Sequence, residues 1–233
     1  MKYTFSKTIV IALGGSIVHP DGIDAAYLKK FKAFLAPFMK KGLHQKNFII
    51  VIGGGTLSRR FQDAAAKVTR VTDEDKDWLG IHATRLNAHL LRTVFRDVAD
   101  PVVVDAREKI ARPTHPVTIA SGWRPGWSTD YVAMRIAADV GADEAIIAGK
   151  PSHVYEADPA KHPRAKRFDK MTWREYRRLV PRSWKPGLHA PVDPVGARLG
   201  QKEGVKAIVI DGRRIANFRA LLNGKDFEGT IIG

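Results

Sequence analysis

Short apolar runs alternate with amphipathic stretches along most of this 233-residue chain. Runs rich in Ile and Val are typical of strands buried on both faces, whereas apolar residues that recur at helical spacing indicate helices. The pattern predicts strands over 8–13, 48–53, 101–104, 117–121, 144–149 and 206–212. It predicts helices over 25–42, 58–68, 76–98, 129–142, 172–180, 192–204 and 214–225.

This order of elements predicts an α/β protein. Strands that alternate with helices form crossover units, and such units build a mainly parallel sheet with helices on both faces. No internal repeat or low-complexity segment interrupts the alternation. The weakest pattern falls in 150–192, which is rich in Pro, Lys, Arg and Trp, and we expect a surface excursion or a lid there.

Composition supports a globular chain, with 44% hydrophobic and 27% charged residues. There is no cysteine, which excludes disulfides and thiolate metal sites. No apolar run reaches the length of a membrane span. The first residues lack the apolar core and small-residue cleavage site of a signal peptide, so the expected location is the cytoplasm.

The formal net charge of +15 would attract polyanions. Lys and Arg are nevertheless spread along the chain, and their densest group, at 164–178, is broken by acidic and aromatic residues. A solvated basic surface is the simpler interpretation, and a nucleic-acid platform is the alternative.

Two glycine clusters follow two of the predicted strands. Gly14, Gly15 and Ser16 come after 8–13, and three consecutive glycines at 53–55 come after 48–53. Ligands of open α/β sheets bind beyond the carboxyl ends of the strands. A turn without side chains that runs into a helix exposes main-chain N–H groups, which favour phosphate. Either Arg59 or Arg60, one turn further on, could add a forked contact to phosphate oxygens.

A third loop, at 121–128, carries two glycines, a proline and two tryptophans. Ser128, Thr129 and Asp130 then begin a helix, so the loop is either a simple turn before a capped helix or a ligand loop. The GxGxxG and GxxxxGK[ST] fingerprints are absent. Three such loops at three strand ends would suit a site for two phosphorylated ligands.

An ordered set of motifs resembles the amino acid kinase family, and within it the uridylate (UMP) kinases of the archaeal type. The set covers nearly the whole chain: IALGGSIV (11–18), VIGGGTLSRRF (51–61), DWLGIHATRLNAHLL (77–91), SGWRPGWSTDYVA (121–133), VYEADP (154–159) and APVDPVGARL (190–199).

The resemblance implies a three-layer α/β/α sandwich around a mainly parallel sheet. It implies that 1–143 forms the lobe for the acceptor UMP and 144–233 the lobe for ATP. The implied reaction is transfer of the γ-phosphoryl group of ATP to UMP with Mg²⁺ as cofactor, giving UDP and ADP. The implied assembly is a homo-oligomer built from dimers, up to a hexamer, with no membrane or nucleic acid as a partner.

The resemblance also implies roles for individual residues. For the catalytic step it implies Gly15, Arg59 and Asp193. For UMP it implies Gly54, Asp77, Gly122, Trp123, Arg124, Pro125, Gly126, Trp127, Ser128 and Thr129, with Asp77 at the ribose. For ATP it implies Gly14, Gly15, Ser16, Gly55, Arg59, Gly149, Lys150, Tyr155 and Asp158.

Each acidic or aromatic candidate also has a structural interpretation. Asp77 could cap a helix, and Asp193 precedes Pro194 where a helix N-cap is favoured. Tyr155 could be a packing residue. We interpret the four scattered histidines as packing or surface residues and not as metal ligands: His82, His89, His153 and His189.

The chain departs from the family pattern in two places. Family members commonly carry a lysine before the first glycine pair, where this chain has Ala12 and Leu13. They also carry a Thr- or Ser-Asn-x-Asp pattern where this chain has Gly149, Lys150 and Ser152, with Pro151 between the last two. These departures leave other readings open: a non-catalytic nucleotide-binding or storage protein, a kinase for a different phosphate or carboxylate acceptor, or a basic nucleic-acid-binding module.

Overall fold

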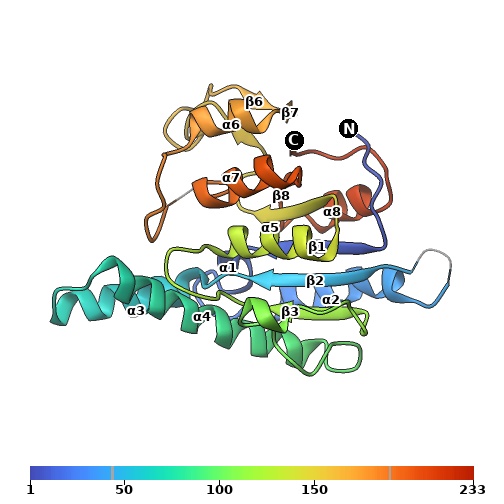
Figure 1. The fold of residues 1–233 in the computed structure, drawn as a ribbon, viewed down its shortest axis with the longest axis horizontal. Helices are drawn as coiled ribbons and strands as arrows, with labels where there is room; N and C mark the ends of the chain where they lie inside the picture. The colour runs from blue at the N-terminus through green and yellow to red at the C-terminus, as the bar shows by residue number, and fades with distance from the viewer. Residues whose placement is uncertain (43–44, 189) are drawn as a thin grey trace.

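The protein is described by a computed structural model that covers residues 1–42, 45–188 and 190–233. Within these ranges a seven-stranded sheet runs through the molecule in the order β3-β2-β1-β4-β8-β9-β7 (Figure 1). Its strands are β1 (Thr8–Leu13), β2 (Asn47–Ile52), β3 (Val117–Ala120), β4 (Glu144–Gly149), β7 (Lys170–Met171), β8 (Lys206–Asp211) and β9 (Thr230–Ile232). The first five in the spatial order are mutually parallel, whereas β9 is antiparallel to β8. The predicted mainly parallel sheet is therefore confirmed.

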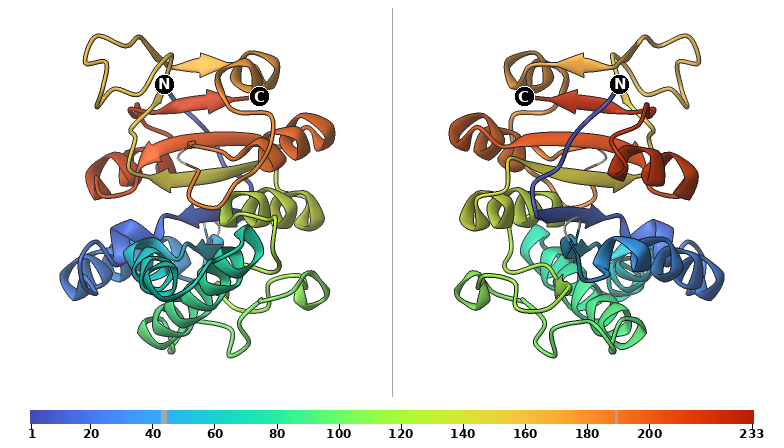
Figure 2. Two further views of the ribbon diagram at one scale, coloured as in Figure 1. Left: turned by 90° about the vertical axis from the view of Figure 1, so that its left-hand side faces the viewer. Right: turned by 90° about the vertical axis from the view of Figure 1, so that its right-hand side faces the viewer.

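Helices cover both faces of this sheet (Figure 2). One face packs against α2 (Ala25–Met39), α4 (Asp73–Val94) and α8 (Ile215–Leu222). The other packs against α5 (Thr129–Val140), α6 (Trp173–Leu179) and α7 (Pro194–Glu203). The three-layer α/β/α architecture is confirmed.

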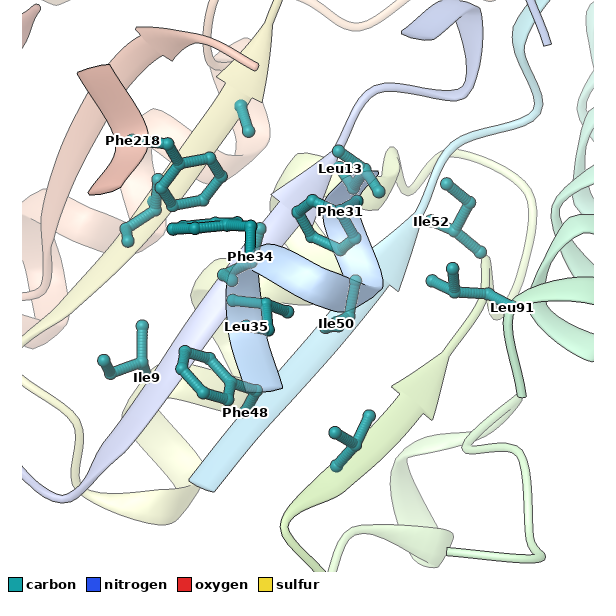
Figure 3. Close-up of a cluster of buried hydrophobic side chains, with 14 of the residues drawn as sticks. Ile9, Leu13, Phe31, Phe34, Leu35, Phe48, Ile50, Ile52, Leu91 and Phe218 are labelled. Carbon is teal, nitrogen blue, oxygen red and sulfur yellow. The ribbon is translucent and has the colours of Figure 1, made fainter. Parts of the chain in front are cut away.

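Successive side chains of β1 point to opposite faces of the sheet, so this strand contributes to the core on both faces. Ile9 and Ile11 enter the layer below α2 and α8, and Val10 enters the layer below α5 and α7. Aromatic rings fill the first layer, where the Phe34 ring lies 5.2 Å from that of Phe218 (Figure 3). Burial of such side chains stabilises the fold by about 1.5–3 kcal/mol each. This packing fixes β1 and its neighbours, and with them the loops at their carboxyl ends.

Several predicted boundaries shift, and one predicted strand is wrong. Residues 101–104 make only an isolated bridge from Val104 to Ala120, because Val102 is turned to solvent and Pro101 lacks an N–H to pair. The helix predicted over 25–42 ends at Met39, well before Gly42. Two others begin earlier than predicted: α3 (Gly55–Val68), which packs against α4, and α4 itself.

The pattern also missed short elements. These are α1 (Gly15–Val18), β5 (Val154–Tyr155), β6 (Arg167–Phe168), β7, β9 and a single 3-10 turn at Arg107–Lys109. The surface excursion expected in 150–192 contains the antiparallel β5–β6 pair and α6. Elements of two or three residues give no detectable periodicity, which is why the sequence did not reveal them.

Candidate active site at the strand ends

The carboxyl ends of the central parallel strands meet at one edge of the sheet. Main-chain hydrogen bonds join their loops directly. The Gly14 N–H donates to Ala148 O at 2.9 Å, and the Gly53 N–H donates to Leu13 O at 3.0 Å. The Gly212 N–H, after β8, donates to Gly149 O at 3.0 Å. The loops predicted to hold phosphates therefore converge.

The two glycine clusters touch each other through bare backbone. A Cβ added to Gly15 would lie 2.2 Å from Gly53 O and 2.3 Å from Gly55 N. Gly55 has φ +62°, in the region where glycine is favoured, and its own Cβ would lie 2.4 Å from Gly15 C. The sequence explains these glycines only by the access of phosphate to the main-chain N–H groups. The structure adds a second reason, which is that the two loops approach each other too closely for side chains.

Helices α1 and α3 begin at these two turns. Their N-cap residues, Gly14 and Gly54, offer no side chain to the first N–H groups. Uncapped N–H groups at a helix start attract anions, and the dipole of the longer α3 adds to this attraction. Two such starts in contact place main-chain donors where an anion would be favoured.

Arg59 bends back toward the start of α3. Its Nη2 donates to Thr56 Oγ1 at 2.9 Å, which holds the guanidinium near the glycine turn. Arg59 and Arg60 are both exposed, but Arg60 makes no such contact among the described residues. Of the two arginines, Arg59 is therefore the one whose side chain is held near the glycine turn.

Asn87 is a buried polar residue that sequence reasoning missed. It lies on α4, and its side-chain N–H₂ donates to Gly53 O at 2.9 Å and to Gly54 O at 3.3 Å. It is 3% exposed. An asparagine among the apolar positions of an amphipathic helix is the signal that could have identified it, because buried amides need partners.

The third loop is tied to α4 at two points. Asp77 Oδ2 accepts a hydrogen bond from the Gly126 N–H at 2.7 Å, and Thr84 Oγ1 accepts one from the Gly122 N–H at 2.8 Å. The suggestion that Asp77 caps the helix is wrong, because Thr72 is the N-cap and Asp75 completes the capping box. Asp77 instead positions the loop that follows β3.

The aromatic residues of this loop have different surroundings. Trp123 is buried, and its Nε1 donates to Val104 O at 3.3 Å, so it packs the loop onto the body. The Arg124 guanidinium lies 3.8 Å from the centre of the half-exposed Trp127 ring, and the Trp127 ring lies 4.6 Å from that of Tyr131. The stacked Arg124 and Trp127 are the members that can meet a ligand. Their contact with uridine stays a prediction, as does that of Pro125.

Ser128 and Asp193 join two helix starts. Ser128 is the N-cap of α5 and accepts from the Tyr131 N–H at 3.0 Å. Asp193 is the N-cap of α7 and accepts from the Val195 and Gly196 N–H groups at 2.7 and 3.1 Å, which confirms its capping interpretation. The Ser128 hydroxyl also donates to Asp193 Oδ2. Asp193 is therefore held rigidly, and its proximity to a transferring phosphoryl group stays a prediction.

Asp130 adds a second carboxylate beside Asp193, and the candidate residues did not include it. It retains partial exposure but accepts no hydrogen bond from the described residues. Burial, and then the negative charge of Asp193, raises the pKa of Asp130 well above its usual range. A cation would relieve both effects, so Asp130 is suited to a site where positive charge arrives.

The remaining candidate ATP residues lie at the end of β4 and beyond it. Gly149 ends that strand, Lys150 is exposed, and Asp158 lies in an exposed turn where it accepts from the Ala160 N–H at 3.0 Å. Tyr155 is half-buried, so the packing interpretation holds only in part. Lys150 follows β4 two residues after Ala148, which pairs with Leu13 at the end of β1, and its role at ATP stays a prediction.

The described part of the chain contains no cluster of three acidic or histidine side chains that could hold a metal. His82 and His89 are exposed on α4, His153 is buried, and His189 lies outside the described residues. Mg²⁺ in phosphoryl-transfer sites is held mainly by phosphates and water with one or two carboxylates. The residues present fit this, with Asp130 as the free carboxylate. None of the helices in the ranges 1–42, 45–188 and 190–233 is long and apolar enough to cross a bilayer.

Fold and site together define a class: an α/β protein with glycine turns in contact at adjoining ends of parallel strands, an arrangement suited to anions. Comparison with known proteins narrows this class. Residues 7–211 match the amino acid kinase family, and the chain belongs to that family.

Its relatives include a protein named uridylate kinase from Methanocorpusculum labreanum, 34% identical over 229 residues, covering 97% of this chain and 95% of the relative. One of the same name from Pyrococcus abyssi is 32% identical, covering 96% and 98%. The crystal structure of uridylate kinase from Archaeoglobus fulgidus superimposes with TM-score 0.76 at 26% identity, covering 98% of this chain and 100% of that one.

Proposed function

We propose that this protein is an ATP-dependent UMP kinase. It transfers the γ-phosphoryl group of ATP to the phosphate of UMP and releases UDP and ADP. The observation that carries this function is the contact between the two glycine turns at the starts of α1 and α3. The likeness over the whole chain to proteins named uridylate kinase supports the choice of acceptor.

The chemistry needs positioning and charge neutralisation more than covalent catalysis. The nucleophile is an ionised phosphate oxygen of UMP, so no general base is required. Main-chain N–H groups at Gly14–Ser16 and at Gly54 and Gly55 would receive the transferring phosphates. Arg59 would add a charged donor where negative charge develops, a type of contact worth about 2.7–4 kcal/mol in other enzymes.

Substrates would divide between the two halves of the sheet. We place UMP on the side of 1–143, against Asp77 and the loop from Gly122 to Thr129, and ATP on the side of 144–233. Mg²⁺ bound to the ATP phosphates would neutralise their charge, with Asp130 within its reach. We place the activity in the cytoplasm and in pyrimidine nucleotide biosynthesis.

We also propose that the protein forms dimers through the outer surface of α3 and α4, up to a hexamer. Four large apolar side chains are exposed there: Phe61 at 55%, Val68 at 87%, Trp78 at 40% and Leu86 at 62%. Large exposed apolar residues on two packed helices are typical of an interface. Light scattering of the wild type and of a Phe61→Ser, Leu86→Ser variant tests this, and a variant that keeps the wild-type mass contradicts it.

The function is tested by incubating the protein with Mg·ATP and each of UMP, CMP, AMP and GMP, and resolving the nucleotide products. We expect UDP in preference to the other diphosphates. Product from a different acceptor would reject the substrate and keep the class of enzyme. Tight ATP binding without turnover of any acceptor would contradict the kinase assignment. An Arg59→Ala preparation, purified in parallel, controls for contaminating kinase.

A further inference from the structure

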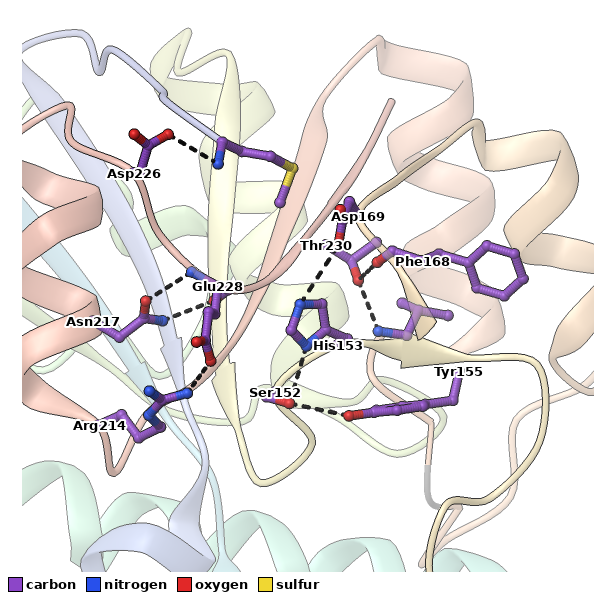
Figure 4. A network of polar contacts seen from close by, with 12 residues as sticks. Ser152, His153, Tyr155, Phe168, Asp169, Arg214, Asn217, Asp226, Glu228 and Thr230 are labelled. Atoms are coloured by element: carbon purple, nitrogen blue, oxygen red, sulfur yellow. Dashed lines mark hydrogen bonds and ion pairs between the residues drawn. The ribbon is translucent and has the colours of Figure 1, made fainter. Parts of the chain in front are cut away.

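A row of polar side chains runs from Tyr155, a candidate ATP residue, past the buried His153 to the exposed Asp169 (Figure 4). Tyr155 OH lies 3.2 Å from Ser152 Oγ, and Ser152 Oγ lies 3.0 Å from His153 Nδ1. The opposite ring nitrogen, His153 Nε2, lies 3.8 Å from Asp169 Oδ1. The row thus connects Tyr155 through a serine and a histidine to an acidic residue between β6 and β7.

His153 is 2% exposed, and no step of the proposed reaction uses it. Charged groups surround it from several elements: Arg167 of β6, Asp169, Glu228 before β9, and Arg214 before α8. Burial, and then the nearby positive charge of Arg167, lowers the pKa of His153 below its ordinary value of 6.5. The ring is therefore neutral at pH 7.5 and carries a single N–H.

The surroundings fix where that hydrogen lies. The Asp169 oxygen that faces Nε2 lies at 3.8 Å, which is longer than a hydrogen bond but on the side where an N–H is attracted, so we assign the N–H to Nε2 of His153. Nδ1 is then an acceptor and takes the Ser152 hydroxyl hydrogen. The Ser152 oxygen is left to accept from the Tyr155 hydroxyl. Every donor in the row then points toward Asp169, away from the Tyr155 oxygen.

We propose that His153 is a positioning residue of the ATP site. Through Ser152 it orients the Tyr155 phenol, so that the Tyr155 hydroxyl donates its hydrogen to Ser152. The Tyr155 oxygen then offers only lone pairs to a ligand. It would accept from the 6-amino group of adenine and repel the 6-oxo group of guanine. This inference rests on the proposed function, because that function places the adenine nucleotide beside Tyr155.

The row also accounts for a departure seen in the sequence. Ser152 stands where the family pattern has aspartate, an acceptor that needs no support. A serine hydroxyl can either donate or accept, so its direction must be set by a neighbour. His153 and Asp169 set that direction here.

The backbone around His153 does not depend on the row. The Val154 N–H donates to Thr230 Oγ1 at 2.8 Å, and the Thr230 hydroxyl donates to Phe168 O. These bonds anchor β5 and β6 independently of the imidazole. Substitutions at 152 and 153 can therefore be compared as folded proteins.

Steady-state kinetics of full-length variants at pH 8 tests the proposal. Ser152→Ala and His153→Phe each remove one link, and His153→Asn keeps an acceptor near the position of Nδ1. The loss of one neutral hydrogen bond predicts a KM for ATP that rises about three- to ten-fold in the first two variants. In the same two variants, the ratio of kcat/KM for GTP to kcat/KM for ATP should rise as well. KM for UMP and kcat stay within two-fold, taken as about the limit of the assay, and His153→Asn restores the KM for ATP.

The pH profile adds a readout that a purely structural role would not change. Protonation places a second N–H on Nδ1, which turns the Ser152 hydrogen toward Tyr155. The wild-type KM for ATP should then rise as the pH falls below 6.5, with a flat profile in His153→Asn. Ser6→Ala, an exposed serine far from the site, is the matched control.

The outcomes separate the two levels of the account. An active wild type whose KM for ATP is unchanged in both Ser152→Ala and His153→Phe overturns the role of His153 alone. If His153→Phe fails to fold, an unchanged KM for ATP in Ser152→Ala is sufficient to overturn that role. A wild type without turnover contradicts the proposed function itself.

Discussion

Gly15→Ala is the substitution for which the structure predicts the largest local conflict. Its Cβ would meet Gly53 O at 2.2 Å, Gly55 N at 2.3 Å and Gly53 C at 2.4 Å. All three are backbone atoms, so no side chain can move aside. The two turns would have to separate by about 1 Å to restore van der Waals contact.

The cost can be estimated in two ways. Overpacking by one methyl group destabilises a protein by about 1–3 kcal/mol. For a chain of this size that corresponds to a fall in Tm of roughly 2–12 °C. A displacement of about 1 Å at a reacting centre can cost a factor of about 100 in rate. We therefore expect kcat/KM to fall at least 100-fold while the protein remains folded at 25 °C.

The assay compares Gly15→Ala with two other glycines. Gly22→Ala has nothing within 4 Å of the added Cβ and should match the wild type in Tm and turnover. Gly14→Ala meets only ordinary contacts, the nearest at 3.4 Å from Ala148 O, so it tests phosphate access without loop contact and should lose less activity than Gly15→Ala. The reasoning would be refuted by a Gly15→Ala variant whose Tm is unchanged and whose kcat/KM lies within about three-fold of the wild-type value, roughly the error of the assay.

Three further predictions concern side chains around the same turns. Arg59→Ala should lower kcat/KM at least about ten-fold in the UMP assay, and Arg60→Ala much less; equal effects would remove the special role of Arg59. Asn87→Ala leaves Gly53 O without its donor, so the free energy of unfolding should fall by about 1–3 kcal/mol in urea titrations. An unchanged midpoint would be inconsistent with that contact. Because the folded state raises the pKa of Asp130, its ionisation costs stability as pH rises from about 4 through the raised pKa. Asp130→Asn should therefore raise Tm at pH 8 by at least about 2 °C and little at pH 4, while turnover falls at least about ten-fold; an equal Tm change at both pH values would argue against a raised pKa of Asp130.

Much of the fold could be predicted because its main elements are long and strongly patterned. β1, β4 and β8 lie where their apolar runs predicted them, and α5 begins one residue after its predicted cap. The 101–104 run has the composition of a strand but lies at an edge where Val102 has no layer to pack against. Whether such a short apolar run forms a strand depends on its tertiary surroundings, and a local sequence pattern carries no information about these surroundings.

The site divides in the same way. Glycine turns at strand ends are visible in sequence because position and residue type together imply a bare backbone. The supports of those turns are not visible. Asn87 contacts Gly53 from a helix that starts 20 residues later in the chain, and Asp77 of the same helix contacts Gly126 in the third loop. Such long-range polar contacts depend on the packing of whole elements, so they could be found only in the folded structure.

The central claim is that main-chain N–H groups at these converging turns, together with Arg59, receive the phosphates of two nucleotides placed end to end. A crystal structure with UMP and a non-hydrolysable ATP analogue tests it most directly. The account predicts phosphate oxygens at about 2.7–3.2 Å from the main-chain nitrogens of Gly15 and Gly55 and near the Arg59 guanidinium. Nucleotides bound away from both glycine turns, or turns that remain unliganded at saturating nucleotide, would contradict it.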